Sequence, residues 1–205
     1  MESVTTDEIL ISHIQKGEHS FFDDLVDRYS QKLLNYVYQL TNNSEDSEDL
    51  LQEVFIRVFS NIKKFDINKQ FKPWVYKIAT NICYDYSRKK KKVISLHKNY
   101  ASEEGSELLE TIADDAANPE ENILNEELLA VLKNAISSLP KKQKEAFVMF
   151  HFDNFSYNEI ADSLDIPVGT VKSRLFNAYE RVYFDVKKEN SDWALKILIA
   201  LIMGC

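Results

Sequence analysis

Apolar residues recur at spacings of three and four along most of the chain, which is the pattern of helices that each bury one face. This period predicts helices over about residues 6–16, 20–40, 45–62, 72–90, 120–137, 141–152, 157–164 and 170–187. The 4 Gly and 4 Pro leave little material for the turns of a many-stranded sheet. Because 44% of the residues are hydrophobic, buried cores are well supplied. We therefore expect an all-α fold.

The segment between the two groups of helices differs from both in composition. Residues 93–126 contain nine acidic residues and one lysine, and the first part of this stretch has little apolar periodicity. Such a composition favours a flexible, self-repelling linker. We therefore expect two helical domains, joined by a linker and followed by an apolar tail. The predicted boundaries are 1–94 for the helical bundle, 95–119 for the acidic linker, 120–190 for a helix-turn-helix domain and 191–205 for the tail.

Charge is distributed unevenly along the chain. The net charge is −8, yet residues 61–92 hold ten Lys or Arg against two Asp. A basic block of this kind can meet a phosphate backbone. The overall acidity therefore does not exclude a nucleic-acid partner.

Several classes of protein are disfavoured by the residues that the sequence lacks. Cys83 and Cys205 lie far apart without metal-ligand spacing, which favours a reducing compartment. The first residues do not resemble a signal peptide, so we expect a cytoplasmic protein. There is no phosphate loop, no nucleophile elbow and no paired His and acid at metal spacing. We therefore expect no enzyme activity, no cofactor, no metal and no small-molecule substrate.

The third predicted helix has an apolar side and an acidic side. The expected core side consists of Leu50, Leu51, Val54, Phe55, Val58, Phe59 and Ile62. The opposite side carries Asp49, Gln52 and Glu53, with Ile56 near its middle. This face can dock a basic partner, but it is also the pattern of an ordinary solvated helix face.

The fourth predicted helix combines a core side with a stripe of aromatic, amide and cationic groups. The stripe consists of Trp74, Lys77, Asn81, Tyr84 and Arg88. Single-stranded DNA is held in this way, because aromatic rings stack on unpaired bases while cations bind phosphates. The run 88–92 adds five positive charges suited to phosphate contact. The alternative is that Trp74 belongs to the core and that the lysines provide solubility.

A helix-turn-helix is predicted near the end of the chain. Ser156 and Glu159 have the spacing of a capping box, in which each side chain satisfies the other residue's backbone donor. The helix that they open breaks over residues 165–169 and restarts at Thr170. The outward residues of the helix that starts at Thr170 are polar or cationic enough to enter a major groove. Helical hairpins of this spacing also occur in purely structural bundles.

Four stretches together resemble the sigma factors of bacterial RNA polymerase, specifically the extracytoplasmic-function (ECF) group. They are residues 49–55, 71–81, 156–161 and 166–175, and the likeness covers nearly the whole chain. The resemblance implies a protein that binds core RNA polymerase and promoter DNA and directs where transcription begins. It also implies an anti-sigma factor as a partner. Membrane contact is expected only through such an inhibitor or through the tail.

The resemblance assigns a role to each surface. The helix with the acidic face implies a polymerase-binding site of Asp49, Gln52, Glu53 and Ile56. The loop 65–71 and the stripe that follows it imply capture of an unpaired promoter base by Phe65, Asn68, Lys69, Phe71, Trp74, Lys77, Asn81, Tyr84 and Arg88. The last helix implies duplex reading by Thr170, Lys172, Ser173, Arg174, Phe176, Asn177 and Arg181.

Two features depart from the family pattern. Members often carry several arginines after the reading helix, whereas residues 177–181 of this chain contain one Arg and one Glu, which predicts weak duplex affinity. The apolar segment 193–203 is shorter than the ~20 residues that span a bilayer. We expect this segment to pack on the second domain or to bind a partner.

One alternative function stays open at the level of sequence. A stand-alone helix-turn-helix regulator would bind operator duplex without polymerase, and its first domain would serve in dimerisation or sensing. Such a regulator does not explain the aromatic and basic stripe, and no dimer seam is evident.

Overall fold

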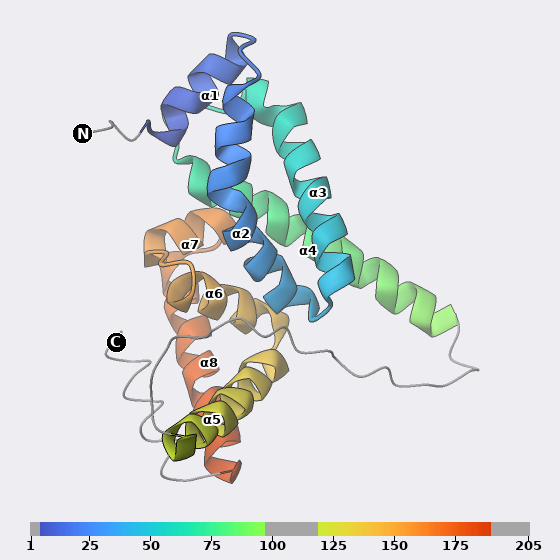
Figure 1. Ribbon diagram of the computed structural model, residues 1–205, viewed down its shortest axis with the longest axis vertical. Coiled ribbons are helices and arrows are strands. Elements are labelled where there is room, and N and C mark those ends of the chain that lie inside the picture. The colour runs from blue at the N-terminus through green and yellow to red at the C-terminus, as the bar shows by residue number, and fades with distance from the viewer. Residues whose placement is uncertain (1–4, 97–118, 190–205) are drawn as a thin grey trace. The chain divides into compact units, whose positions relative to one another are not determined.

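The computed structural model describes residues 5–96 and 119–189, with side chains over 5–91 and 127–189 (Figure 1). These residues form helices and no strand, so the expected all-α fold is confirmed over the described part of the chain. The helices are α1 (Asp7–Gln15), α2 (Phe21–Thr41), α3 (Ser44–Asn61), the 3₁₀ helix η1 (Ile62–Lys64), α4 (Phe71–Leu96), α5 (Pro119–Ser138), α6 (Lys141–His151), α7 (Tyr157–Leu164) and α8 (Val168–Glu189). They divide into two compact units, one built mainly on α1–α4 and the other mainly on α5–α8.

Helix boundaries follow the apolar period closely, with two informative differences. α4 continues past residue 90 to Leu96, into the first residues of the predicted linker. α8 begins at Val168 rather than at Thr170. Most of the linker and all of the tail at 191–205 lie outside the described residues, so the domain boundaries stay predictions. None of the helices in the described ranges is long and apolar enough to cross a membrane.

In the first unit, α2 packs against α1, α3 and α4, and the buried side chains come mainly from the apolar stripes of these helices. At its centre the rings of Tyr36 and Tyr76 lie 4.9 Å apart. The Tyr36 hydroxyl is 2.7 Å from Thr80 Oγ1, and Thr80 Oγ1 in turn donates to the Tyr76 carbonyl at 2.8 Å. Because a buried polar group without a partner is costly, this chain of hydrogen bonds lets α2 and α4 bury hydroxyl groups in the core.

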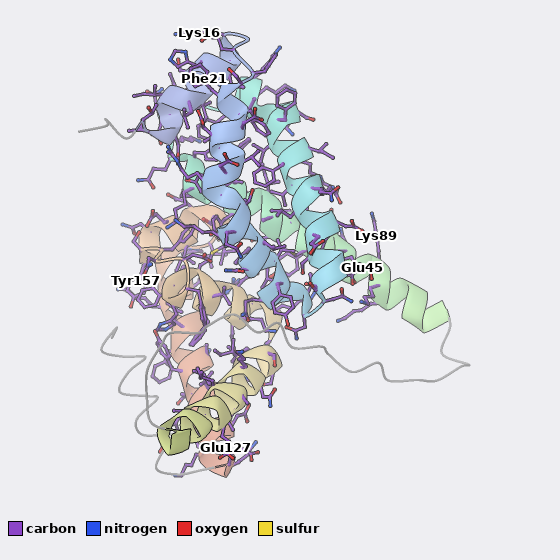
Figure 2. The ribbon with its side chains drawn as sticks, viewed as in Figure 1. Lys16, Phe21, Glu45, Lys89, Glu127 and Tyr157 are labelled. Carbon is purple, nitrogen blue, oxygen red and sulfur yellow. The ribbon has the colours of Figure 1, made fainter. Side chains whose placement is uncertain are left out.

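Two successive asparagines join α2 to α3. Asn42 follows the last turn of α2 in the left-handed region, at φ 54°, which asparagine tolerates better than most residues. Asn43 is the N-cap of α3, and its side-chain oxygen accepts a 2.9 Å hydrogen bond from the Asp46 N–H. The turn that joins α1 to α2, between Lys16 and Phe21, instead uses Gly17 at φ 102° (Figure 2).

The second unit holds α8 against α6 and α5. The side of α8 that faces the core has the expected three-and-four spacing, with Val171, Leu175, Ala178, Val182 and Val186 all buried. Across from it, Ala146, Phe147 and Met149 of α6 are fully buried. The outer side of α8 is therefore left for solvent or a partner.

The helix-turn-helix begins with the predicted capping box. Ser156 N donates to Glu159 Oε2 at 2.8 Å, and Glu159 N donates to Ser156 Oγ at 3.2 Å, so this prediction is confirmed. The turn differs from the expected one, because Asp165 adopts the left-handed conformation at φ 55° and Gly169 already lies in α8. The Pro167 carbonyl accepts from the N–H groups of Thr170 and Val171, which starts α8 two residues early.

The two asparagines should respond differently to substitution. Asn43→Ala removes the N-cap and should lower the free energy of unfolding by about 1 kcal/mol. Asn42→Gly keeps a residue that accepts the left-handed conformation and should change stability by only a few tenths of a kcal/mol. Denaturant titration of both variants checks this, and equal losses would contradict the assigned cap.

Candidate nucleic-acid interface

The residues predicted to bind polymerase share one exposed face of α3. Asp49, Gln52 and Ile56 are exposed, and Ile56 is 65% accessible. Glu53 lies beside them and pairs with Arg57 at 2.5 Å, one turn further along. Phe59, expected in the core, is instead 43% exposed because it sits at the edge of the apolar stripe, against Phe22. The face is therefore acidic with apolar residues along it.

An aromatic corner fixes the start of α4. Phe71 is 1% exposed, and its ring centroid lies 5.9 Å from Phe65 and 5.6 Å from Trp74. Phe65 is 7% exposed and lies 4.9 Å from Trp74. Phe71 thus supports the loop from within and offers almost no surface to a ligand. Trp74 is only half-buried, so part of its ring is accessible.

The loop between η1 and α4 is organised by Asp66, which sequence reasoning did not single out. Asp66 Oδ1 accepts from both the backbone N–H and the side-chain amide of Asn68, at 3.0 and 2.9 Å. These hydrogen bonds, the backbone one first, lower the pKa of Asp66. The Asp66 carbonyl also accepts from Lys69 N. Asn68 and Lys69 are exposed as predicted, but part of the Asn68 amide is engaged within the loop.

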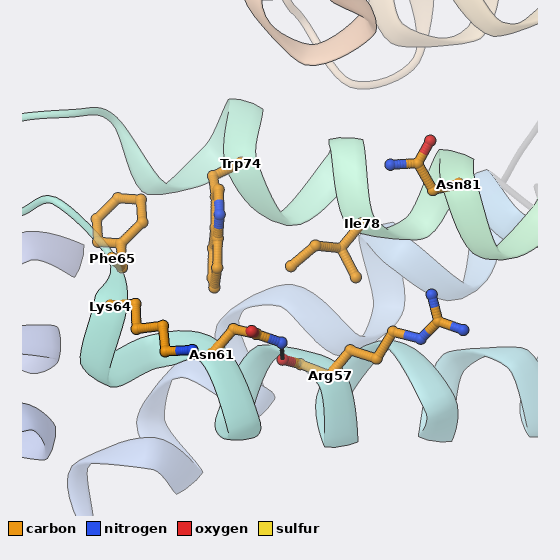
Figure 3. Close-up of a pocket in the computed structure, with 7 residues that line it drawn as sticks. All are labelled: Arg57, Asn61, Lys64, Phe65, Trp74, Ile78 and Asn81. Carbon is orange, nitrogen blue, oxygen red and sulfur yellow. Dashed lines mark hydrogen bonds between the residues drawn. The ribbon is translucent and has the colours of Figure 1, made fainter.

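A pocket of about 330 Å³ lies between α3, η1 and α4 (Figure 3). Its lining residues are Arg57, Asn61, Lys64, Phe65, Trp74, Ile78 and Asn81. In Figure 3, Trp74 projects from α4 between Phe65 and Ile78, towards Asn61 and Lys64. Asn61 Nδ2 donates to the Arg57 carbonyl at 2.8 Å, which anchors the amide. The pocket thus combines an aromatic wall with amides and two cations.

Three of these residues were missed at the level of sequence. Arg57, Asn61 and Lys64 follow one another at spacings of four and three along α3 and η1, so they share a face. That spacing was available in the sequence, but only the packing of α3 beside α4 shows that this face meets the Trp74 stripe. Lys77 is half-buried on the same helix as Trp74.

The C-terminal half of α4 uses part of its positive charge within the first unit. Lys90 Nζ lies 3.2 Å from Asp46 Oδ2 and donates to the Tyr86 hydroxyl at 2.7 Å, which raises the pKa of Lys90. Arg88 pairs with Asp85, while its side chain remains highly exposed. Tyr84 is half-buried. The basic run is therefore partly a clamp between α4 and the start of α3.

The outer side of α8 presents most of the residues predicted to read duplex. Lys172, Ser173, Asn177 and Arg181 are exposed, and Phe176 is 62% exposed. Thr170 is half-buried near the start of the helix, where its carbonyl accepts from Ser173 Oγ at 2.9 Å.

Arg174 differs from its neighbours because it faces inward. Its Nη1 lies 2.7 Å from Oε1 of the buried Glu145, with the two side chains 16% and 4% exposed. This ion pair joins α8 to α6. The geometry thus gives Arg174 a role in holding the helix, while its predicted DNA contact stays a prediction.

A second polar contact between α6 and α8 involves His151 and Tyr179. His151 Nε2 and the Tyr179 hydroxyl lie 2.9 Å apart, next to the Phe147 ring. Burial lowers the pKa of His151 to about 4, and burial also raises the pKa of Tyr179, to about 12. Both groups therefore stay neutral near pH 7.

Comparison with known proteins places both units in one class. Residues 25–93 match the family described as Sigma-70 region 2, and residues 129–182 match Sigma-70, region 4. The first unit thus matches one family of this class and the second unit matches the other.

Relatives narrow the class further. The chain is 38% identical over 170 residues to the ECF RNA polymerase sigma factor SigW of Bacillus subtilis (strain 168), covering 83% of this chain and 91% of that protein. It is 34% identical over 187 residues to the ECF RNA polymerase sigma-E factor of Escherichia coli (strain K12), covering 89% of this chain and 95% of that protein. The chain therefore belongs to the ECF RNA polymerase sigma factors.

Solved structures share the fold. The sigma factor RpoE from Bartonella quintana, in a co-crystal with the anti-sigma factor NepR, has a TM-score of 0.66 at 21% identity and covers 81% of this chain and 96% of its own. CnrH, in complex with the cytosolic domain of CnrY, has a TM-score of 0.65 at 19% identity, and the match covers 90% of this chain and 99% of CnrH.

The neutral His151 predicts how stability depends on pH. In the unfolded chain a histidine takes up a proton near pH 6.5, whereas folded His151 resists protonation down to about pH 4. The unfolded state thus binds more protons between these values, so stability should fall as the pH is lowered from 7 towards 4. His151→Gln should weaken this dependence. The check is the shift in Tm between pH 7.5 and 5.5, and an equal shift in both proteins would contradict the assignment.

Proposed function

We propose that the chain binds core RNA polymerase and directs promoter-specific initiation of transcription through three separate surfaces. The observation that carries this proposal is the pocket between α3 and α4, because it joins an accessible tryptophan to amides and cations on the unit that matches Sigma-70 region 2. A protein that only read duplex would have no use for such a pocket. The chain acts by binding, without catalysis or a cofactor, in the cytoplasm where polymerase works.

Polymerase docks on the exposed face of α3. Asp49, Gln52 and Glu53 supply polar and acidic contacts, and Ile56 supplies an apolar anchor near the middle. An exposed apolar residue surrounded by polar ones is the usual anatomy of a protein interface. The complementary surface is therefore basic at its rim and apolar at its centre.

The pocket captures one unpaired base of the promoter. Trp74 stacks on the base, an interaction worth about 1–3 kcal/mol, and this offsets part of the few kcal/mol that unstacking the base costs. The amides of Asn61 and Asn81 offer donors and acceptors to the edges of the base. Arg57 and Lys64 hold the phosphates, together with Lys69, Lys77 and Arg88 outside the pocket.

The outer side of α8 reads the upstream promoter element as duplex. Ser173 and Asn177 contact base edges in the major groove, while Lys172 and Arg181 contact phosphates. The exposed ring of Phe176 makes an apolar contact with the methyl group of a thymine. Arg174 and His151 act behind this surface by holding α8 on α6.

An anti-sigma factor belongs to this proposal as a further partner. The Bartonella quintana sigma factor that shares this fold was crystallised with the anti-sigma factor NepR. The exposed face of α3 around Ile56 and the predicted tail at 191–205 are the segments best suited to such a partner. The stand-alone regulator is the less favoured function, because it leaves the match to Sigma-70 region 2 without a role.

Polymerase docking is tested by a matched pair of substitutions on exposed isoleucines. Ile56→Glu should weaken binding to core RNA polymerase by about ten-fold or more, because it buries an unpaired charge at the centre of the interface. Ile9→Glu makes the same change on α1, where the side chain is 49% exposed, and should leave the affinity unchanged. Competition binding with labelled chain measures both, and equal losses or none would sink the assignment.

Strand capture is tested by transcription from a pool of random promoters. Trp74→Ala and Asn81→Ala should keep core polymerase binding but reduce defined transcription starts by about ten-fold or more. Asn177→Ala should instead relax the sequence preference of the upstream element. If the Trp74 and Asn81 variants initiated like the unmodified chain, the pocket would have no part in promoter opening.

A further inference from the structure

The wall of the pocket that comes from η1 is held from outside by α1. Gln15, the last residue of α1, reaches η1 with its side-chain amide. Nε2 donates to the Ile62 carbonyl at 2.8 Å and to the Phe65 carbonyl at 2.9 Å. Lys64 lies between these two carbonyls and Phe65 carries the second one, and both residues line the pocket. One side chain, distant in sequence, thus fixes both ends of this short turn.

The turn has a backbone hydrogen bond at its end, and Gln15 adds two more from outside. Within it, Phe65 N donates to the Ile62 carbonyl at 3.1 Å, and the backbone is extended at Phe65, with ψ 132°. Carbonyls at a helix end have no partner within the helix and must be satisfied from elsewhere. With the two N–H groups of one amide, Gln15 satisfies the Phe65 carbonyl and gives the Ile62 carbonyl a second donor beside Phe65 N. It is half-buried, so water competes less well for these carbonyls than at an open helix end.

Residues that meet the same turn from the other side do not duplicate this contact. Trp74 and Phe71 pack against the Phe65 ring, which fixes the ring but not the backbone carbonyl. Asp66 organises the following residues, Asn68 and Lys69. Gln15 therefore acts on the one part of the pocket wall that neither the aromatic corner nor the loop controls.

We propose that Gln15 is a positioning residue for promoter-strand capture, and this inference rests on the function proposed for the pocket. It does not line the pocket and acts through η1, by setting where Lys64 and Phe65 face Trp74. Geometry of a binding wall must be held closely, so a loosened turn weakens capture even where the fold persists. A purely structural Gln15 would change only the stability of the first unit.

The test uses the full chain bound to core RNA polymerase. Gln15→Met keeps the length and packing of the side chain but removes the donors, and Gln15→Glu turns an acceptor towards two carbonyl oxygens. The matched controls are Gln31→Met and Gln31→Glu, at an exposed glutamine of α2. The probe is a labelled single-stranded oligonucleotide with the non-template sequence of a promoter selected by the unmodified complex. All affinities are measured well below the Tm of every variant.

Both Gln15 variants should bind the strand on the order of ten-fold more weakly, the loss that one or two hydrogen bonds carry. The Gln31 controls, polymerase affinity and upstream duplex affinity should stay within two-fold. In the free chain with a Trp193→Phe background, Trp74 is the single tryptophan, and acrylamide should quench its fluorescence more strongly in the Gln15 variants. Unchanged strand affinity and quenching, with only a lower Tm, would overturn the inference.

Asn81→Ala separates this inference from the function on which it rests. If Asn81→Ala weakens strand binding and the Gln15 variants do not, the pocket captures the strand and Gln15 is structural. If neither substitution weakens strand binding, the proposed function of the pocket fails, and the positioning role fails with it.

Discussion

Phe71 begins α4 at a point where aromatic rings from α2, the end of η1 and α4 itself meet. Its centroid lies 5.3 Å from Tyr29, 5.9 Å from Phe65 and 5.6 Å from Trp74. These ring contacts hold the chain where it turns from η1 into α4. They therefore help to set how far Arg57, Asn61 and Lys64 lie from the stripe that contains Trp74. Tyr29, Phe65 and Phe71 are buried in this corner, and Trp74 is the member that stays partly accessible and lines the pocket.

The second unit depends on an analogous constraint, made of polar groups. Glu145–Arg174 and His151–Tyr179 both join α6 to α8, and both combine burial with a satisfied hydrogen bond. Breaking one partner of a buried pair is costly, so these contacts favour a single position for α8 on α6. The polar and cationic outer side of α8 is thereby presented as a fixed surface. Each unit thus separates the residues that hold its surface from those that present it.

Much of this organisation could be predicted from periodicity alone. The apolar spacing predicted the α-helices of the described residues, most of them to within two positions at each end, but it missed η1 and the last six residues of α4. The spacing of Ser156 and Glu159 correctly predicted the capping box. Periodicity failed at Phe59, which lies at the edge of an apolar stripe and is exposed rather than buried. It also could not show that Asp165, a residue other than glycine, adopts the left-handed backbone conformation in the turn. It could not show that Arg174 turns inward or that Gln15 reaches η1, because both contacts join residues far apart in sequence.

The account is tested most directly by locating the unpaired promoter base in the initiation complex. A non-template strand carrying a photoreactive base at successive positions is assembled with the chain and core RNA polymerase, irradiated, and the cross-linked peptides are mapped. One position at the upstream edge of the opened region should cross-link to the residues that line the pocket, Trp74 foremost, and only when polymerase is present. Cross-links confined to α8, or formed equally without polymerase, would contradict capture of an unpaired base by the first unit.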